Sequence, residues 1–204
     1  MAKMSAAHME ARVNGILDAA ETCFIKKGLH QTTMHDICEE SELSPGAVYR
    51  YFKSKEDLIY AVAERRTEQE MEFIREAESQ TPGPVEALAF LGDRFYGQFL
   101  RPDFEHWARL DIETWPEALR NPRHRARVRE QRARLRAALA GVFSSAIEQS
   151  TEPSNVDPMT MAMLLMALYR GLQLHKAIDP EGVDTQAVFR ILTESMVASE
   201  TATE

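Results

Sequence analysis

Residues 44–55 read Ser-Pro-Gly-Ala-Val-Tyr-Arg-Tyr-Phe-Lys-Ser-Lys, and much of the fold can be predicted outward from them. The stretch holds three aromatic and three cationic residues and no acidic residue, although the complete chain of 204 residues carries a formal net charge of −8. Serine is favoured as the N-cap of a helix and proline at its first position. We therefore expect a short helix from Pro45 to about Phe52, with Ser44 as its N-cap.

At ~100° per residue, the side chains of this short helix point in different directions. Pro45, Val48 and Phe52 fall on one side, which we expect to pack inward, and Tyr49 and Tyr51 lie on the flanks. The opposite side carries small residues and one arginine: Gly46, Ala47 and Arg50. Such a side suits a helix in a DNA major groove, because small residues allow close approach and an arginine can pair with guanine.

Helix signals also precede this stretch. A stripe of apolar residues at helical spacing predicts a first helix that ends near Lys27, since Gly28 follows two lysines. A second short helix should occupy residues 34–40 with Thr33 as its N-cap, and a turn at residues 41–44 follows it. Two short helices joined by such a turn and packed on a longer helix form a helix-turn-helix candidate.

The stretch FIKKGLHQTTMHDICEESELSPGAVYRYFKSKEDL, residues 24–58, resembles the DNA-binding signature of the tetracycline-repressor (TetR) family of transcriptional regulators. The matching features are the glycine after the first helix, the Thr-Thr pair, Ser-Pro-Gly before an apolar-Tyr pair, Tyr-Phe, and Lys-Ser-Lys-Glu-x-Leu. The resemblance implies phosphate contacts from Thr33, Tyr49, Tyr51 and Lys55, and base contacts from the outward side of the third helix. The complete candidate DNA-binding set is Thr33, His35, Ser44, Pro45, Gly46, Ala47, Tyr49, Arg50, Tyr51, Lys53 and Lys55.

Two features depart from the family pattern. Glu42 occupies the turn position where the family usually has glycine, and a left-handed backbone there would cost roughly 1–2 kcal/mol. Residues 1–60 hold seven cationic and nine acidic side chains, a formal net charge of −2 that is low for a DNA-binding domain. A helical interaction protein that has lost DNA binding is therefore an alternative interpretation.

The remaining sequence reads as helical, so the predicted fold class is all-α. We divide the chain into a three-helix DNA-binding domain at residues 1–54, a connecting helix at 55–80 with a mostly solvated second half, and an effector-binding and dimerisation domain at 81–204. The sequence Thr-Pro-Gly-Pro at 81–84 marks the boundary. Further helices are expected at residues 84–100, 103–118, 122–149, 158–177 and 184–199.

Residues 158–178 are apolar nearly all round, which predicts burial both within the chain and against a partner. In the TetR family the last two helices pair with those of a second subunit as a four-helix bundle, and these segments resemble that arrangement. A two-fold dimer places two recognition helices about 34–36 Å apart, on the two halves of a palindrome. The candidate interface residues are Leu164, Leu168, Leu172 and Ile191.

By the same resemblance, a small-molecule effector should bind among the helices between residues 84 and 141. A carboxylate among aromatic rings favours a cation, so Asp111 suggests a cationic effector. We nevertheless prefer a structural ion pair of Asp111 with a core arginine such as Arg170, and keep the ligand role as the second interpretation. The complete candidate effector set is Phe95, Phe99, Phe104, Trp107, Asp111 and Trp115.

Residues 120–136 are rich in arginine and have the composition of a nucleic-acid patch. Their helical spacing instead places Val128 and Leu135 on a core-facing side and the arginines on the outside. We expect a solvated cationic face, with a role toward a partner or an anionic ligand as the alternative.

Composition and motifs argue against other classes of protein. The two cysteines, Cys23 and Cys38, lie in helical patterns and are expected to be reduced core residues. The sequence lacks the serine-hydrolase, zinc-protease and phosphate-loop motifs, so no catalytic residue, metal site or cofactor is expected. There is no signal peptide, and no apolar run approaches the ~20 residues of a membrane span, so a cytoplasmic location is expected. The sequence predicts a dimeric, ligand-responsive transcriptional regulator that binds double-stranded DNA, with repressor preferred over activator.

Overall fold

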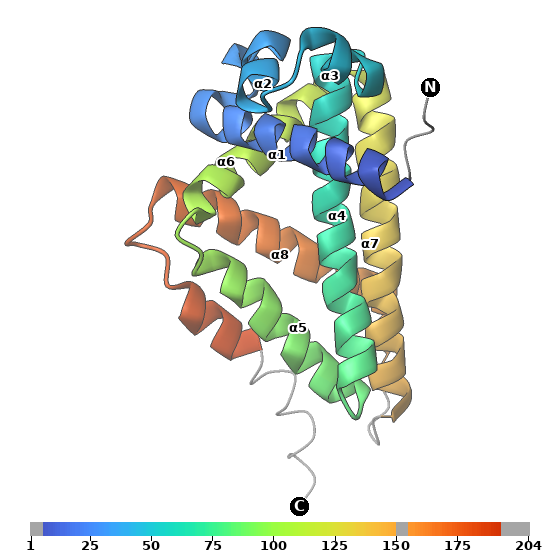
Figure 1. Ribbon diagram of the computed structural model, residues 1–204. Coiled ribbons are helices and arrows are strands. Elements are labelled where there is room, and N and C mark those ends of the chain that lie inside the picture. The colour runs from blue at the N-terminus through green and yellow to red at the C-terminus, as the bar shows by residue number, and fades with distance from the viewer. Residues whose placement is uncertain (1–5, 150–154, 193–204) are drawn as a thin grey trace, which may run out of the picture. The chain divides into compact units, whose positions relative to one another are not determined.

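The computed structural model describes residues 6–149 and 155–192, and no strand occurs among them, which confirms an all-α fold. The helices are α1 (Ala6–Gln31), α2 (Met34–Glu40), α3 (Pro45–Tyr51), α4 (Lys55–Gln80), α5 (Pro84–Phe99), α6 (Phe104–Arg120), α7 (Pro122–Gln149) and α8 (Pro158–Ile178) (Figure 1). Residues 185–192 are also helical. The rest of the last expected helix, at 184–199, lies outside the described residues.

The ends of the helices follow from local capping chemistry. The Asp157 side chain accepts a hydrogen bond from the backbone N–H of Thr160 at 2.9 Å and caps α8, and proline occupies the first position of α3, α5 and α8. Gly28 interrupts α1 with φ 78° and ψ 164°, which only glycine adopts readily. The predicted glycine break after the first helix is thereby confirmed, although helical turns resume up to Gln31.

The chain forms two compact units. Among the described residues, the first unit comprises 6–66 and 109–127, and the second comprises 67–108 and 128–192 with the gap at 150–154. The chain therefore passes from one unit to the other inside α4, α6 and α7. The Thr-Pro-Gly-Pro break at 81–84 separates α4 from α5 within the second unit.

The core of the first unit joins the three N-terminal helices to the start of α4. Ile16 of α1, Ile37 of α2, Val48 of α3 and Leu58 of α4 are completely buried. Val48 and Phe52 pack inward as predicted. The prediction was wrong for Pro45, which is exposed, because its first-turn position lies beyond the part of α3 that packs against the core.

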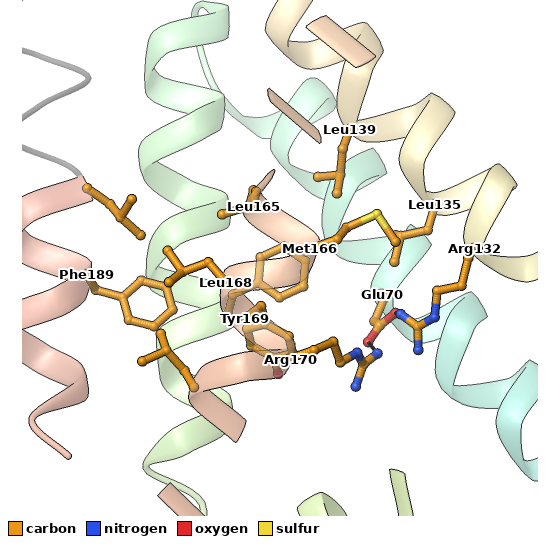
Figure 2. A pocket seen from close by; sticks show the side chains of 13 residues that line it. Glu70, Arg132, Leu135, Leu139, Leu165, Met166, Leu168, Tyr169, Arg170 and Phe189 are labelled. Carbon is orange, nitrogen blue, oxygen red and sulfur yellow. Dashed lines mark hydrogen bonds and ion pairs between the residues drawn. The ribbon is translucent and has the colours of Figure 1, made fainter. Parts of the chain in front are cut away.

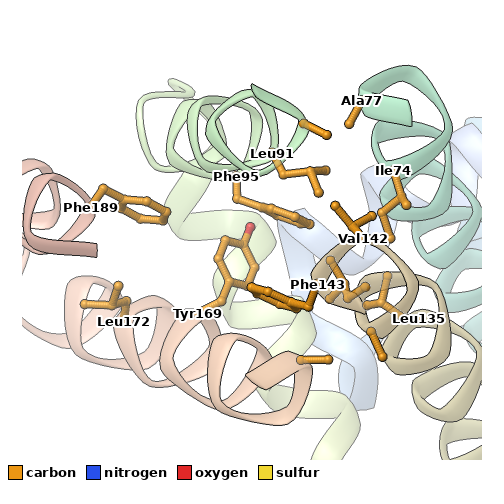
Figure 3. Packing of buried hydrophobic residues seen from close by; sticks show 14 of the residues in the cluster. Ile74, Ala77, Leu91, Phe95, Leu135, Val142, Phe143, Tyr169, Leu172 and Phe189 are labelled. Atoms are coloured by element: carbon orange, nitrogen blue, oxygen red, sulfur yellow. The ribbon is translucent and has the colours of Figure 1, made fainter. Parts of the chain in front are cut away.

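Aromatic rings dominate the core of the second unit. Tyr169 of α8 makes an edge contact with Phe95 of α5 (Figure 3). It makes a second edge contact with Phe99, and the ring centroids of each pair are 5.3 Å apart. Ile74 and Ala77 in the second half of α4 are buried in the same core. The expectation that this half of α4 is mostly solvated is therefore wrong for the side of the helix that carries Ile74 and Ala77. Among the residues that the structure describes, no helix combines the length and apolarity needed to cross a membrane.

Candidate nucleic-acid interface and ligand cavity

A capping box fixes the start of α2. The backbone N–H of Asp36 donates to the Thr33 hydroxyl at 3.2 Å, and the backbone N–H of Thr33 donates to the Asp36 carboxylate at 2.7 Å. Lys27 donates to the same carboxylate at 2.6 Å, and this bond holds the pKa of Asp36 well below its usual value. The end of α1 and the start of α2 are thus tied together, and the hydroxyl of Thr33, predicted to contact phosphate, already has a structural partner.

The turn between α2 and α3 contains a strained residue. Glu42 has φ 54°, and it is the one residue other than glycine with a positive φ in the described part of the chain. The backbone N–H of Leu43 bonds the Cys38 carbonyl at 3.1 Å and closes the turn around it. The left-handed conformation considered for Glu42 is therefore present.

The outward side of α3 is accessible. All eleven residues of the candidate DNA-binding set keep exposed surface, and Ala47, Tyr51 and Lys55 are the half-buried ones. Within the described residues, no side chain or carbonyl pairs with Arg50, so its guanidinium donors remain available to a partner. The stretch 44–55 that contains them carries no carboxylate.

Gly46 has no structural need to be glycine. A Cβ atom placed there would meet no other atom of the described chain within 4 Å, and the backbone there is helical. A requirement for the missing side chain would have to come from a bound partner. Close approach to base edges in a major groove is such a requirement.

The two lysines after α3 differ in their contacts. Lys55 Nζ donates to the carbonyls of Leu29 at 2.9 Å and His30 at 3.2 Å, where α1 leaves carbonyl groups without helical partners. Lys53 is exposed and donates to the Tyr49 carbonyl at 2.7 Å. Lys55 therefore stabilises the end of α1, and its predicted phosphate contact remains a prediction.

The last part of α6 anchors the break in α1. The Glu113 carboxylate accepts a bond from the backbone N–H of Leu29 at 2.9 Å and one from Arg109 at 2.9 Å. Leu29 directly follows Gly28, so the contact holds the chain where it leaves the regular helix. The same unit contains an ion pair of 3.2 Å between Asp111 and Arg66.

A buried histidine connects the end of α6 to α7. His124 Nε2 lies 3.1 Å from the Thr114 carbonyl, so this nitrogen carries the proton, and the imidazole stacks on Tyr60 with centroids 4.8 Å apart. Burial lowers the pKa of His124, which keeps the ring neutral. The contact adds a rigid, uncharged support for α6 within the first unit.

The second unit contains a largely apolar cavity (Figure 2). Its empty volume is about 450 Å³, including the open solvent at its mouth. Ten of its lining residues are aliphatic or aromatic, and three charged residues stand together at one side. The lining comprises Glu70, Phe95, Arg132, Leu135, Leu139, Leu165, Met166, Leu168, Tyr169, Arg170, Leu172, Phe189 and Leu192.

Of the six candidate effector residues, Phe95 lines this cavity. Phe99 and Phe104 are buried in the aromatic core of the second unit, with their rings 5.1 Å apart. Trp107 donates from its indole nitrogen to Asp103 at 2.7 Å. The last two candidates, Asp111 and Trp115, belong to the first unit, and Trp115 is 49% exposed.

The ion pair of Asp111 with Arg66 is the type of contact that the structural interpretation of Asp111 predicts. Arg170, named as an example of its partner, pairs with Glu70 at 2.9 Å.

The four candidate interface residues separate into two groups. Leu164 and Ile191 are 58% and 61% exposed, so both leave apolar surface open on this chain. Leu172 is buried in the core of its own chain, and Leu168 is half-buried at the cavity wall. Further exposed apolar side chains on α8 are Met159, Met163, Leu174 and Ile178.

Sequence reasoning missed the charged side of the cavity. Glu70 lies in a highly charged part of α4, and Arg132 lies in the arginine-rich part of α7, so both looked like solvent-exposed residues. Their helical positions could have indicated otherwise. Glu70 lies four residues before Ile74, and Arg132 lies three residues before Leu135, so each neighbours a buried residue on its own helix.

Family models match both the N-terminal and the C-terminal part of the chain. The family model described as "Bacterial regulatory proteins, tetR family" matches residues 16–62, and the model described as "BetI-type transcriptional repressor, C-terminal" matches residues 96–200, more than half of the chain.

Individual proteins give the same result. The HTH-type transcriptional regulator UidR of Escherichia coli is 26% identical over 176 residues, which are 85% of each chain. The solved structure of Salmonella enterica GusR has a TM-score of 0.75 at 26% identity and covers 97% of this chain and 100% of its own. The structure of FadR from Bacillus subtilis has a TM-score of 0.76 and covers 91% of this chain and 98% of its own. At 19% identity, this likeness shows a common fold alone. The helix-turn-helix geometry and the matching family models together show that this chain belongs to the TetR family of transcriptional regulators.

Proposed function

We propose that the chain is a dimeric, ligand-responsive repressor that binds a palindromic DNA operator through α3 and is released by a small-molecule effector. The observation that carries the proposal is the outward side of α3, where Gly46 and Arg50 are exposed and unopposed by any carboxylate within residues 44–55. The guanidinium of Arg50 suits bidentate pairing with guanine. Tyr49 and Lys53 flank it and suit phosphate contacts, which fix the register of the helix on the duplex.

Dimerisation is supported by the surface of α8. Met163 and Leu174 lie 11 residues apart, which places them on one side of the helix, and both are exposed. Exposed apolar side chains gathered on one side of a helix are typical of protein interfaces. A two-fold dimer would offer two copies of α3 to two half-sites about 34–36 Å apart.

Release by an effector is supported by the cavity in the second unit. Solved structures of the same fold at 19–23% identity are complexes with stearoyl-CoA, choline and triclosan, so proteins of this fold bind small molecules of unlike chemistry. An effector can release DNA only if it binds a non-DNA-binding conformation more tightly than the DNA-binding one. The name of the matched C-terminal family model supports repression over activation.

The carboxylates before α3 favour the alternative of an interaction protein without DNA binding. Glu39, Glu40 and Glu42 are exposed or partly exposed close to the recognition helix. Glu40 pairs with Lys26 at 3.2 Å, which reduces its repulsion of phosphate, and Glu39 lies 3.3 Å from the His35 imidazole.

A mobility-shift assay with DNA from upstream of the chain's own gene tests the proposal. We expect Arg50→Gln to weaken specific binding about tenfold or more, as expected for loss of one bidentate base contact. Arg75→Gln is the matched control, because Arg75 is an exposed arginine on α4 that pairs with Glu72 in the second unit. Gly46→Ala should weaken binding without lowering thermal stability, since the added methyl group meets no protein atom.

Two results would contradict the proposal. Equal operator affinity for Arg50→Gln and Arg75→Gln would remove α3 from the interface. Absence of any specific shift with upstream DNA, from a dimeric and folded protein, would favour the interaction protein instead.

A further inference from the structure

Of the six histidines, all of which lie within the described residues, His124 alone is buried. Its side chain is 1% exposed at the start of α7. The Nε2 atom donates to the Thr114 carbonyl of α6 at 3.1 Å, and the ring stacks on Tyr60 of α4. One imidazole therefore joins three helices of the first unit.

A second proton on this imidazole would have no acceptor. The Nδ1 atom is buried, and no other described residue forms a hydrogen bond with it. Protonation would turn Nδ1 into a donor and place a full positive charge in the core, and both changes cost free energy when no partner is present. Burial accordingly lowers the pKa of His124.

The charged groups near the ring do not reverse this effect. Arg127 lies 4.4 Å from the centroid of the Tyr60 ring, so a charged His124 would be a second cation against the same ring. Glu117 favours the proton, but burial outweighs it. The titratable and charged groups that act on His124 or on its stacking partner are Tyr60, Glu56 and Asp57 of α4, Glu117 of α6 and Arg127 of α7.

His124 supports the part of α6 that holds the end of α1. Pro116 has no N–H, so α6 lacks one bond of its own backbone ladder in the turn that contains Thr114. The residue before Thr114 is Glu113, whose carboxylate accepts from the backbone N–H of Leu29 at 2.9 Å. Any loosening at Thr114 would therefore reach the start of the DNA-binding helices through the adjacent residue.

We propose that His124 is a positioning residue that makes DNA binding sensitive to acid. In its neutral form the imidazole holds α6 in the place where Glu113 can fix the end of α1. Once protonated, the imidazole must leave its buried site, and α6 and the end of α1 loosen together. The effect on DNA rests on the proposed function, but the loosening itself can be measured without DNA.

The sign of the pH dependence follows from proton linkage. The ordinary pKa of histidine is about 6.5, and the buried ring takes up a proton less readily than an exposed one. The loosened state therefore binds more protons below about pH 6.5, so its population rises as the pH falls. Acid should have the opposite effect through the exposed His35 of the candidate DNA-binding set, because its protonation adds a cation near phosphate.

Operator affinity, measured by fluorescence anisotropy at constant ionic strength and at about pH 7.5, 6.5 and 5.5, tests the proposal. The matched variant is His124→Gln, whose side-chain amide can still donate to the Thr114 carbonyl but does not titrate. The affinity of the parent relative to His124→Gln should fall by about three- to tenfold between pH 6.5 and 5.5, since one proton is linked to the change.

Two further variants complete the comparison. His124→Phe retains a ring against Tyr60 and does not titrate, so its affinity relative to His124→Gln should be independent of pH. His106→Gln is the control, because His106 is an exposed histidine near the start of α6 in the second unit. This control should keep the pH profile of the parent.

Two measurements follow the loosening without DNA. The protection factor of the Leu29 amide against hydrogen exchange should fall below about pH 6.5 in the parent but not in His124→Gln. The ¹⁵N chemical shifts of the His124 ring should show a proton on Nε2 alone at neutral pH, and a second proton over the same range in which Leu29 loses protection.

The outcomes separate this proposal from the proposed function. A constant affinity ratio between parent and His124→Gln, or a ring that stays neutral while the affinity falls, would overturn the role of His124. Operator binding with a Leu29 protection factor that does not change with pH would also overturn it and leave the proposed function intact. The expected loss of Leu29 protection in a protein that binds no operator at any pH would support the role of His124 in holding α6 and count against the proposed function.

Discussion

Glu42 combines two unfavourable features in one residue. Its backbone is left-handed, with φ 54°, which costs an L-residue roughly 1–2 kcal/mol relative to a right-handed conformation. Its carboxylate lies in the turn that leads into α3, where the phosphates of a bound duplex would be close. Strain and charge at this position act on different properties, because strain lowers folding stability and charge lowers DNA affinity.

A pair of substitutions separates the two effects. The free energy of unfolding should be about 1 kcal/mol higher for Glu42→Gly than for Glu42→Ala. Glycine adopts a positive φ without strain, and this gain exceeds the loss from its greater conformational freedom in the unfolded state. Both variants should bind operator more tightly than the parent and with similar affinity, since both remove the carboxylate. Chemical denaturation and mobility shifts measure the two quantities.

Equal stability of the glycine and alanine variants would show that the turn is not strained. Unchanged operator affinity in both would show that the carboxylate lies too far from the duplex to repel it.

Thr33 and Lys55 show what a sequence motif leaves open. The resemblance assigns both residues to phosphate contacts, and the structure gives both a partner within the protein. Thr33 caps α2 and Lys55 binds the carbonyls at the end of α1. Because a polar group can serve a fold and a ligand alike, its presence in a motif does not separate the two roles.

Like α4 and α7, α6 passes from one compact unit to the other. Its first residues, up to Ala108, belong to the second unit, and its remainder belongs to the first. Glu113 binds the backbone N–H of Leu29, immediately after the break at Gly28. This bond fixes the direction in which the chain leaves α1 toward α2 and α3.

Removal of this bond should loosen the end of α1. Glu113→Ala should lower the free energy of unfolding by about 1–2 kcal/mol, as expected when a backbone donor loses a charged acceptor. The amide of Leu29 should exchange with solvent faster, and operator binding should weaken, because the position of α3 is less well defined. Native-state hydrogen exchange measures the first effect directly.

The control for this prediction is Glu105→Ala, an exposed glutamate near the start of the same helix. A Leu29 amide that stays protected in Glu113→Ala would show that the glutamate does not hold the break.

Helix positions were predictable from sequence because they depend on local chemistry. From α2 onward, the described ends agree with the expected ends to within two residues, since caps such as Thr33 and Asp157 and first-turn prolines are visible in sequence. The neighbours of each helix face were less predictable. Phe104 and Asp111 share a face of α6, but neither lines the cavity: Phe104 is buried in the core of the second unit, and Asp111 belongs to the first unit.

For the complete chain, the exposed apolar side of α8 predicts an assembly larger than one subunit. The double variant Met163→Glu, Leu174→Glu places two like charges on that side, and a two-fold interface would double the number. We expect the dimer dissociation constant to rise at least about a hundredfold, because like charges at an interface cost several kcal/mol. Sedimentation velocity measures the change, and operator affinity should fall with it.

Met9→Glu serves as the control, since Met9 is a comparably exposed methionine on α1 in the other unit. A double variant that remains dimeric would place the interface elsewhere on the chain.

The passage of α6 through both units also gives the protein a built-in optical probe. The chain has two tryptophans, and α6 carries both: Trp107 in the second unit and Trp115 in the first. The indole of Trp107 is bonded to Asp103, whereas half of Trp115 is open to solvent, so a soluble quencher such as iodide should distinguish them. Replacing either one with phenylalanine leaves a single emitter. The parts of one helix that belong to the second and to the first unit can then be followed separately, in unlabelled protein, while a candidate effector or DNA is added.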